Sequence, residues 1–596
     1  MNDNNMYTAN LSINMMKDAD DFAVADTIKK KLISKTVNSD GTYIAKHDDA
    51  DGYSDVIVDV PTGEVVRKDV NFYDYDGMRL YSYTKEEFLE MDSYPENPVH
   101  EGLTAQGWNW SFDNAKTYVR AYGLVNIGQM YITDDGKTRY YISLVNDRLS
   151  PLLKLYLNEN TEVNVDWGDG SPVTNWTTTD AGYKEERHTY PEMGDYVLSI
   201  EVVSGSISLK PTTNPAMGII SDGKNGHETS NMAYYSAVRK IELGADIANI
   251  DSQAFMCYQS LVTITIPDNI SFMGTTAFST CNRLTSIVLP KGLTSVENTV
   301  FSGCNALAMC IFPDTITSIG ENAFQECFRL SDITIPESTT TLYGTAFDDC
   351  KALFSIIIPD SVQTLYYQLF QFCRALTYVK FPSTVSDMGT KIFYMCGLES
   401  FDYPKGVGVV KDSFFYNCTS LRSVTLPDDI KTIDTAAFSY AKSLATIDIP
   451  EGVTTIGGFA FQYCYSLYTL TIPSTVTSIG QSAFKDCTGI DHFKFAGSVP
   501  PTIANSNVWT NVPNTALLYI PALYFSAYRS AQNYPNVYTI RYVGYGTYAD
   551  GEVLPTQTID GTRTLTWYAT IDDWRNRTNP ITVGNGNEVY ARTNPD

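Results

Sequence analysis

The middle of the chain repeats itself with a fixed period. Ten prolines follow one another at steps of 23 residues, with one step of 22: Pro267, Pro290, Pro313, Pro336, Pro359, Pro382, Pro404, Pro427, Pro450 and Pro473. Eleven residues after each comes a phenylalanine: Phe278, Phe301, Phe324, Phe347, Phe370, Phe393, Phe415, Phe438, Phe461 and Phe484. Gly244 and Phe255 add an earlier turn, which makes eleven. A period of this size predicts a solenoid, in which each repeat packs on its neighbours.

Each turn reads approximately L-x-x-I-x-I-P-x-x-V-x-x-I-x-x-x-A-F-x-x-C. In one copy, Ile333 and Ile335 alternate with polar residues, so they are expected on the inner face of a short strand. Pro336 then ends the strand because it has no N–H to donate to a ladder. Parallel stacking places turns about 4.8 Å apart, so eleven turns would rise roughly 50 Å.

Cysteine returns at one position of this repeat. Nine of the eleven cysteines share it: Cys281, Cys304, Cys327, Cys350, Cys373, Cys396, Cys418, Cys464 and Cys487. Tyr258 and Ala441 fill it in the other two turns, and an alanine has no ligand or redox chemistry. An evenly spaced column suggests no disulfide pairs, and the paired C-x-x-C spacing of zinc sites is missing. We therefore interpret the column as buried, reduced packing residues.

The repeat resembles the BspA-type leucine-rich repeat over residues 238–497. The segment LLYIPALYFSAYRSAQNYPNVYTI at 517–540 resembles the closing cap of such arrays, a strand followed by an amphipathic helix. Proteins with these repeats are mostly surface-exposed adhesins and binding proteins, some of them phage-borne. The resemblance therefore implies binding and not catalysis.

The residues before the repeat suggest several smaller parts. NMMKDADDFAVADTIKKKLIS at 14–34 predicts a helix, with acidic residues early and lysines late. Residues 36–63 predict two strands around an Asp/Gly-rich turn. Residues 69–157 predict a small α+β module, with Thr84 and either Ser111 or Asp113 as helix starts. Both of the last two segments resemble parts of tail and surface proteins from phages of gut bacteria.

VNVDWGDGSPVTNW at 163–176, followed by RHTYPEMGDYVLSIEV at 187–202, resembles a PKD domain, an immunoglobulin-like β-sandwich. Gly168 and Gly170 suit a tight turn in which Asp169 bonds its own backbone. Trp167 is expected in the sandwich core. We interpret these residues as shaping the fold and not as a binding site.

The predicted fold class is a mainly β, multidomain protein with a leucine-rich-repeat solenoid. We expect a helical anchor at 1–35, a short β element at 36–63, a small α+β module at 64–157 and a PKD-like sandwich at 158–210. A linker at 211–237 leads to the repeats at 238–497, their cap at 498–543 and a small β module at 544–596. The last of these weakly resembles a β module of Listeria and Bacteroides surface proteins.

Charge and motifs limit the function. The net charge of −26 argues against nucleic acid and anionic membrane as partners. Residues 1–17 lack the apolar core of a secretory signal, and no apolar run is long enough to span a bilayer. The five histidines are scattered, and no H-E-x-x-H, G-x-S-x-G or P-loop occurs. We expect no enzyme, no cofactor and no metal site.

Two columns are candidate binding residues. Strand residues between the two inward positions point outward, and four of them define the first column: Thr334, Ile357, Lys380 and Asp402. The second column lies in the turn after phenylalanine: Phe372, Tyr394, Tyr416, Tyr440 and Tyr463. Exposed aromatic rings can stack on sugars or anchor an interface, but they can equally cover the core and stack on one another.

These features predict a phage virion structural protein, a tail- or head-attached fibre or receptor-binding component. Its expected partners are other virion proteins at the N-terminal region, a glycan or protein of the host bacterial surface, and further copies of itself. It would be assembled in the host cytoplasm. Two alternatives stay open: a bacterial cell-surface adhesin, and a glycan depolymerase, which would need a carboxylate pair that no spacing singles out.

Overall fold

The computed structural model describes residues 31–37, 43–48, 56–58, 69–145, 149–211, 219–221, 236–521, 524–534, 541–547, 558–559, 563–568, 580–581 and 588–593. The chain divides into two compact units. Unit 1 comprises Met1–Gln363 and Cys373–Pro382, and unit 2 comprises Thr364–Phe372 and Ser383–Asp596.

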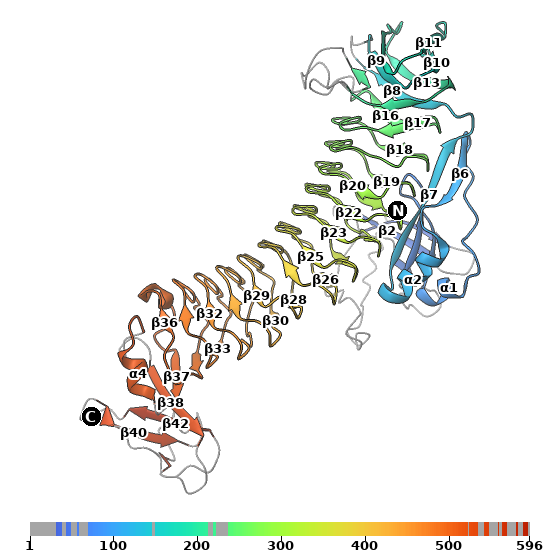
Figure 1. Ribbon diagram of the computed structural model, residues 1–596. Helices are drawn as coiled ribbons and strands as arrows, with labels where there is room; N and C mark the ends of the chain where they lie inside the picture. The colour runs from blue at the N-terminus through green and yellow to red at the C-terminus, as the bar shows by residue number, and fades with distance from the viewer. Residues whose placement is uncertain are drawn as a thin grey trace, which may run out of the picture. The chain divides into compact units, whose positions relative to one another are not determined.

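The repeats form a stack of short parallel strands in each unit, arranged in two columns (Figure 1). In unit 1 the first column contains β16 (Val238–Glu242), β18 (Thr263–Thr265), β19 (Ser286–Val288), β21 (Met309–Ile311), β24 (Ser355–Ile357) and β26 (Tyr378–Lys380). Its second column contains β17 (Ile247–Ile250), β20 (Ser295–Val296), β22 (Ser318–Ile319) and β23 (Thr341–Leu342). The predicted mainly β solenoid with turns of 23 residues is confirmed.

Unit 2 continues the same pattern. Its first column contains β28 (Ser400–Asp402), β30 (Ser423–Thr425), β33 (Thr469–Ile472), β35 (His492–Phe495) and β37 (Leu517–Pro521). Its second column contains β25 (Thr364–Leu365), β27 (Asp387–Met388), β29 (Val409–Val410), β31 (Thr432–Ile433), β32 (Thr455–Ile456), β34 (Ser478–Ile479) and β36 (Thr502–Ile503). Trp509 extends the aromatic column, with its ring 5.9 Å from Phe484. The solenoid thus has one turn more than predicted, because this last turn replaces the repeat's phenylalanine and proline.

Two interior columns hold neighbouring turns together. Phenylalanine rings stack from turn to turn, for example Phe301 on Phe324 at 5.3 Å and Phe438 on Phe461 at 5.2 Å. Each thiol of the cysteine column donates to the phenylalanine carbonyl of the preceding turn, as Cys327 does to Phe301 at 3.2 Å. All eleven cysteines are free and buried, which agrees with the packing interpretation. The sequence did not reveal the thiol–carbonyl bonds.

The turns hold non-glycine residues in the left-handed region. Asn322 and Glu326 have φ of 55° and 59°, and most other turns place a residue there at the same two positions. Such residues cost free energy because their Cβ crowds the backbone. The N–H of Glu326 donates to the Asp348 carbonyl of the next turn at 2.9 Å, and this bond offsets part of the cost.

The proline of each turn interrupts the hydrogen-bond ladder of the first strand column once per turn. The residue before proline donates to the next turn, as Leu289 does to Ile311 at 3.0 Å. Its own carbonyl then faces the proline of the next turn, which has no N–H. Ala496, which takes the place of that proline, donates to the Ile472 carbonyl at 2.9 Å. Proline therefore leaves one strand carbonyl per turn without its ladder donor.

Two sheets precede the solenoid and run into it. One has the order β11-β10-β13-β8-β16-β18 and the other β12-β9-β14-β17. They are built from β8 (Thr138–Leu144), β9 (Leu152–Leu157), β10 (Thr161–Asp166), β11 (Thr174–Thr178), β12 (Gly182–Arg187), β13 (Gly194–Ser204) and β14 (Ile207–Leu209); β15 (Ile220–Ser221) also pairs with β9. β8 and β9 lie inside the expected 64–157 module, yet they pair with β13 and β12. These sheets cover the apolar end of the first turn, as a solenoid requires.

A small α+β module makes up residues 69–133. Its sheet has the order β5-β4-β7-β6, from β4 (Val70–Tyr73), β5 (Arg79–Tyr83), β6 (Leu103–Trp108) and β7 (Val125–Thr133). Helix α1 (Lys85–Glu90) begins at N-cap Thr84, and α2 (Phe112–Tyr122) begins at N-cap Ser111, which confirms both predicted helix starts. Its core gathers aromatic side chains around Phe72 and Phe88.

At the C-terminal end the first column continues beyond the repeats. β37 pairs in parallel with β38 (Arg541–Thr547), which is followed in the sheet by β42 (Glu588–Thr593), β40 (Arg563–Tyr568) and β39 (Thr558–Ile559); β41 (Pro580–Ile581) pairs with β40. A 3-10 helix (Ser506–Trp509) precedes β37, and α4 (Phe525–Ser530) lies between β37 and β38. Tyr528 of α4 is buried and donates to the Gly497 carbonyl at 2.8 Å.

The predicted N-terminal helix is wrong over its last residues. Lys31–Val37 forms strand β1, which pairs antiparallel with β2 (Tyr43–Asp48), and β2 pairs with β3 (Val56–Val58). Residues 32–33 and 36–37 include the β-branched Ile33, Thr36 and Val37, which favour a strand once a partner strand is present. The rest of that predicted helix, residues 14–30, lies outside the described residues.

The cysteine column leads to a chemical prediction. Burial raises the pKa of Cys418 to about 12 and that of Cys327 and Cys350 well above the ordinary thiol value. Because the thiolate is the nucleophile, the native protein should not react with an aromatic disulfide reagent at pH 8 within minutes. After unfolding in guanidinium, all eleven thiols should react. Prompt reaction of any native thiol would contradict the buried column.

Candidate functional site

The outward face of the first strand column is the candidate binding surface, and in unit 1 the chain itself covers much of it. Val288, Ile311 and Thr334 are 6%, 2% and 8% exposed. The α+β module lies on them, with β7 facing β18, β19 and β21 (Figure 1). A Cβ on Gly128 of β7 would come within 2.6 Å of Val288 Cγ1, so only glycine permits this approach.

The prediction that Thr334 faces solvent is therefore wrong. Its Oγ1 accepts a hydrogen bond of 3.2 Å from the backbone N–H of Asn126. The nearby side chain of Asn126 donates to Asp332 at 2.8 Å. Of the strand predicted at residues 332–336, the structure has only an isolated bridge between Asp332 and Met309. Thr334 bonds to the module and not to solvent, so this side of the turn is an internal interface.

The module bonds to the carbonyls that proline leaves without a ladder donor. Asn109 Nδ2 lies 3.5 Å from the Leu289 carbonyl oxygen, Trp110 Nε1 donates to Phe312 at 2.7 Å, and the Tyr118 hydroxyl donates to Ile335 at 2.8 Å. Leu289, Phe312 and Ile335 occupy the same position in three consecutive turns. Side-chain donors of the module thus complete the backbone hydrogen bonding of these turns.

Carboxylates just after proline receive further donors from the module. Asp314 accepts from the Ser111 N–H at 3.0 Å and from Asn114 Nδ2 at 2.8 Å. The Tyr122 hydroxyl donates to the Glu337 carboxylate. Each of two turns therefore offers one carbonyl and one carboxylate. Residues 110, 114, 118 and 122 supply the donors at four-residue spacing; Trp110 precedes the N-cap of α2, and the other three lie in the helix.

The next two predicted residues lie at the edge of this interface. Ile357 is half-buried, and Lys380 is exposed. The Lys380 ammonium lies 5.5 Å from the Tyr122 ring centre, which is a cation–π distance. Tyr122 also accepts from the Asp360 N–H at 3.0 Å. Lys380 thus lies beside the docked module.

In unit 2 the same face is exposed in the described residues. Asp402 is exposed, and so are the residues that follow it in the column: Thr425, Asp448 and Thr471. Carboxylates and hydroxyls alternate along this face, which suits a ligand that donates hydrogen bonds or carries positive charge. Among the predicted face residues, Asp402 is thus solvent-exposed, together with the residues that follow it in the column.

The aromatic column is half-buried and internally stacked. Tyr394 lies 4.7 Å from Tyr416 with nearly parallel rings, and Tyr440 lies 4.3 Å from Tyr463. Phe372 meets Tyr394 edge-on at 5.7 Å. Burial raises the pKa of Tyr394, Tyr416 and Tyr440. Because the ring faces contact one another, this geometry favours the covering alternative over sugar stacking.

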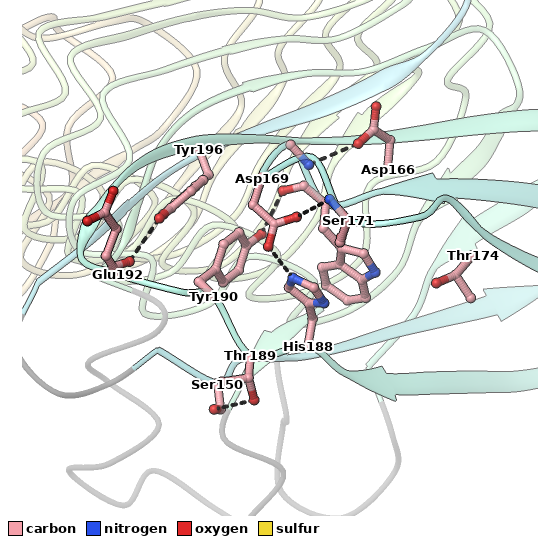
Figure 2. Close-up of polar contacts among 12 residues, drawn as sticks. Ser150, Asp166, Asp169, Ser171, Thr174, His188, Thr189, Tyr190, Glu192 and Tyr196 are labelled. Atoms are coloured by element: carbon pink, nitrogen blue, oxygen red, sulfur yellow. Dashed lines mark hydrogen bonds and ion pairs between the residues drawn. The ribbon is translucent and has the colours of Figure 1, made fainter.

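Figure 2 shows the polar contacts around the W-G-D-G turn. The Asp169 carboxylate lies 2.6 Å from His188 Nε2 and accepts the Ser171 N–H at 3.0 Å. The Trp167 and His188 rings stack at 4.5 Å, and Trp167 is 2% exposed. A Cβ on Gly168 would meet the Val197 carbonyl oxygen at 2.4 Å. These contacts fix a turn between β10 and β11 and bury the Trp167 ring.

Two properties concern the described residues only. No three His, Cys, Asp or Glu side chains there are grouped as metal ligands would be. No helix in that part of the chain is both long and apolar enough to cross a bilayer. Among the described histidine side chains, His100 pairs with Asp74 at 2.7 Å and His492 with Asp491 at 3.2 Å, each in a different element.

Short parallel strands, inward aliphatic residues and a turn of fixed length define a leucine-rich-repeat solenoid protein. Residues 229–353, 301–422, 349–465 and 408–522 match the family described as BspA type Leucine rich repeat region. Across these residues the chain is a BspA-type leucine-rich repeat protein, which confirms the resemblance that the sequence carries. No curated protein matches the chain.

Three solved structures are similar in part. A leucine-rich repeat protein from Bacteroides ovatus ATCC 8483 is 23% identical, with 57% of this chain and 96% of that chain covered and a TM-score of 0.39. A leucine rich cell surface protein from Faecalibacterium prausnitzii A2-165 is 24% identical, with 50% and 92% covered and a TM-score of 0.31. The T. pallidum protein TpLRR is 32% identical, with 26% and 71% covered and a TM-score of 0.25. None of the three is described as a phage protein or a PKD domain, so both of those assignments stay predictions.

The docked module allows a first test at the site. Trp110→Phe keeps an aromatic ring but removes the donor to the Phe312 carbonyl, which faces Pro336 and has no ladder donor. Leaving this buried acceptor unpaired should destabilise the docked module by about 1–3 kcal/mol. Hydrogen–deuterium exchange of residues 103–133 should rise accordingly.

The matched control is Trp509→Phe, which removes a comparable donor to the Asn533 carbonyl in unit 2. That variant should leave exchange of residues 103–133 unchanged. Equal exchange in the wild type and in Trp110→Phe would show that the Trp110 bond does not hold the module.

The Asp169 turn should respond to acid. Burial alone would raise the pKa of Asp169, but hydrogen bonds from Ser171 and His188 outweigh it and lower the pKa to about 2. The carboxylate therefore stabilises the fold above pH 4, and this stabilisation is lost as the pH falls from 4 towards 2. Asp169→Asn should cost about 2 kcal/mol at pH 7 and remove most of that acid sensitivity.

Hydrogen–deuterium exchange of residues 161–178, corrected for the intrinsic effect of pH, measures this stabilisation. A wild-type turn that opens no more readily at pH 2.5 than at pH 5 would contradict the assignment of the low pKa to Asp169.

Proposed function

We propose that this protein is a surface-displayed binding protein that contacts its ligand with the exposed strand face of unit 2. The observation that carries the proposal is the contrast between the two units. The outward column is covered in unit 1 at Val288, Ile311 and Thr334, whereas Asp402, Thr425 and Asp448 are exposed. The BspA-type repeat supports this, because proteins with that repeat are mostly surface-exposed binding proteins.

We propose further that it binds and does not catalyse. Asp402 and Asp448 lie two turns apart in the first column, so neighbouring turns place them about 10 Å from each other. This spacing is at the upper end of the roughly 5–9.5 Å that separates the paired carboxylates of glycosidases, so release of reducing ends is the direct test of catalysis. A regular row of acidic and hydroxyl groups suits recognition along an extended surface.

The place of display is the bacterial cell surface in this proposal. The family implies that location more directly than a virion. The phage alternative depends on resemblances in residues 36–157, part of which lies outside the described residues. Immunogold labelling of cells and of purified phage particles would separate the two: labelled particles and unlabelled cells would overturn the cell-surface assignment.

Binding can be tested with the purified chain on intact bacterial cells, including Bacteroides ovatus, and on their extracted surface polysaccharides. Asp402→Asn/Asp448→Asn removes two charges from the face and should weaken binding at least about tenfold, roughly 1.4 kcal/mol. Asp387→Asn is the matched control, since Asp387 is exposed in the second column. Equal loss in both variants would refute a role for the strand face, and release of reducing ends from the polysaccharide would show an enzyme.

A further inference from the structure

The carbonyl position that the module uses in unit 1 recurs in unit 2. Tyr403, Leu426 and Ile449 each precede proline, and their carbonyls face Pro427, Pro450 and Pro473 of the following turns. These prolines cannot donate. Ile472, the next residue in the series, faces Ala496 and does receive a ladder bond of 2.9 Å. Proline removes the N–H that would face each of the three preceding carbonyls. Residues 444–450 also form no strand, so the ladder is interrupted at that turn as well.

Exposure distinguishes the two sets of carbonyl-bearing residues. Leu289, Phe312 and Ile335 are 0%, 1% and 0% exposed beneath the module. Tyr403, Leu426 and Ile449 are 4%, 9% and 8% exposed. Within the part of unit 2 that the structure describes, no side chain donates to the carbonyls of Tyr403, Leu426 or Ile449.

The carboxylates recur as well. Asp428 and Glu451 follow Pro427 and Pro450, as Asp314 and Glu337 follow their prolines in the docked turns. Both are exposed. Glu451 accepts from Ser474 of the next turn at 2.8 Å, which fixes its side chain at the edge of the strand. Two consecutive turns of unit 2 therefore repeat the carbonyl–carboxylate pair that α2 occupies in unit 1.

We infer that residues 403–451 form a second docking lane, which binds a helix of a partner protein carrying aromatic and amide donors at four-residue spacing. The lane consists of the carbonyls of Tyr403, Leu426 and Ile449 with the carboxylates of Asp428 and Glu451. This deepens the proposed function, because it names the class of ligand for the same face.

Charge indicates how that helix differs from α2. The docked turns place Ile311 and Thr334 under the module, whereas the open turns place Thr425 and Asp448 at these positions. An uncharged apolar side chain opposite Asp448 would leave a carboxylate desolvated and unpaired. In unit 1 the corresponding residues lie under strand β7 and not under α2. The partner therefore carries a lysine or arginine beside the bound helix, opposite Asp448.

The probe is a helix-stapled peptide of residues 108–123, which contains the four donor positions. Stapling is needed because an isolated helix of this length is marginal in water. Added to the full chain, the peptide should bind saturably and protect residues 403–451 from hydrogen exchange. A peptide with Tyr118→Phe and Tyr122→Phe should bind at least about tenfold more weakly, since each hydroxyl donates in the docked module.

The decisive variant changes no exposed side chain. Pro427→Ala/Pro450→Ala supplies N–H groups to the Tyr403 and Leu426 carbonyls, as Ala496 does to Ile472. It should weaken peptide binding at least about tenfold while thermal unfolding stays the same or shifts upward. Pro267→Ala, which makes the same change opposite Leu243, is the matched control and should bind as the wild type does. If the double variant fails to fold, Asp428→Asn/Glu451→Gln tests the same lane through its carboxylates.

Each outcome decides one point. No peptide binding, or binding that neither lane variant weakens, overturns the docking lane. Protection confined to residues 286–337 would mean that the peptide only replaces the chain's own α2, and this too overturns it. A polysaccharide that binds where the peptide does not, and that the proline variant releases, makes the occupant a glycan. If the protein binds cells through Asp402 and Asp448 but does not bind the peptide, the proposed function is supported. Only the proposal of a helical ligand is then refuted.

Discussion

The absence of one N–H group per turn governs how this solenoid meets other surfaces. Backbone hydrogen bonds between turns hold the stack, yet the proline that ends each strand cannot complete the bond to the carbonyl of the preceding turn. Ala496 shows the consequence directly, because its N–H closes the bond to Ile472 that proline omits elsewhere. A row of acceptors along one edge of the strand face results. Trp110 and Tyr118 of the α+β module donate to two members of that row.

The interior of the solenoid is chemically unreactive. Phenylalanine rings stack through the turns, and buried thiols bond to phenylalanine carbonyls instead of pairing with each other. Burial raises the pKa of these thiols, so neither nucleophilic nor metal chemistry is favoured there. Recognition is left to the outward strand residues and to the carbonyl edge, where polar groups repeat at the spacing of the turns.

Much of the solenoid could be predicted from the sequence, since its period is local and repeated. Ile333 and Ile335 point inward, Cys327 is buried, and Thr84 and Ser111 start their helices as expected. The twelfth turn was missed because Trp509 and Ala496 replace the two marker residues. The strand at Lys31–Val37 was mistaken for a helix because its pairing with Tyr43–Asp48 outweighs the charge pattern. Thr334 was correctly placed outward and wrongly taken as accessible.

The sequence by itself determined the turn length, the inward columns and the identity of the residue that lacks an N–H, because each depends on neighbours along the chain or on its exact repeat. Only the tertiary structure decided which part of the strand face remains exposed. Gly128, Asn109 and Tyr118 lie 160 residues or more before the turns they contact, and no periodicity connects them to Val288, Leu289 or Ile335. Contacts of that kind depend on the shapes of two folded surfaces, and the same row of carbonyls can thus be an internal seam in unit 1 and an exposed edge in unit 2.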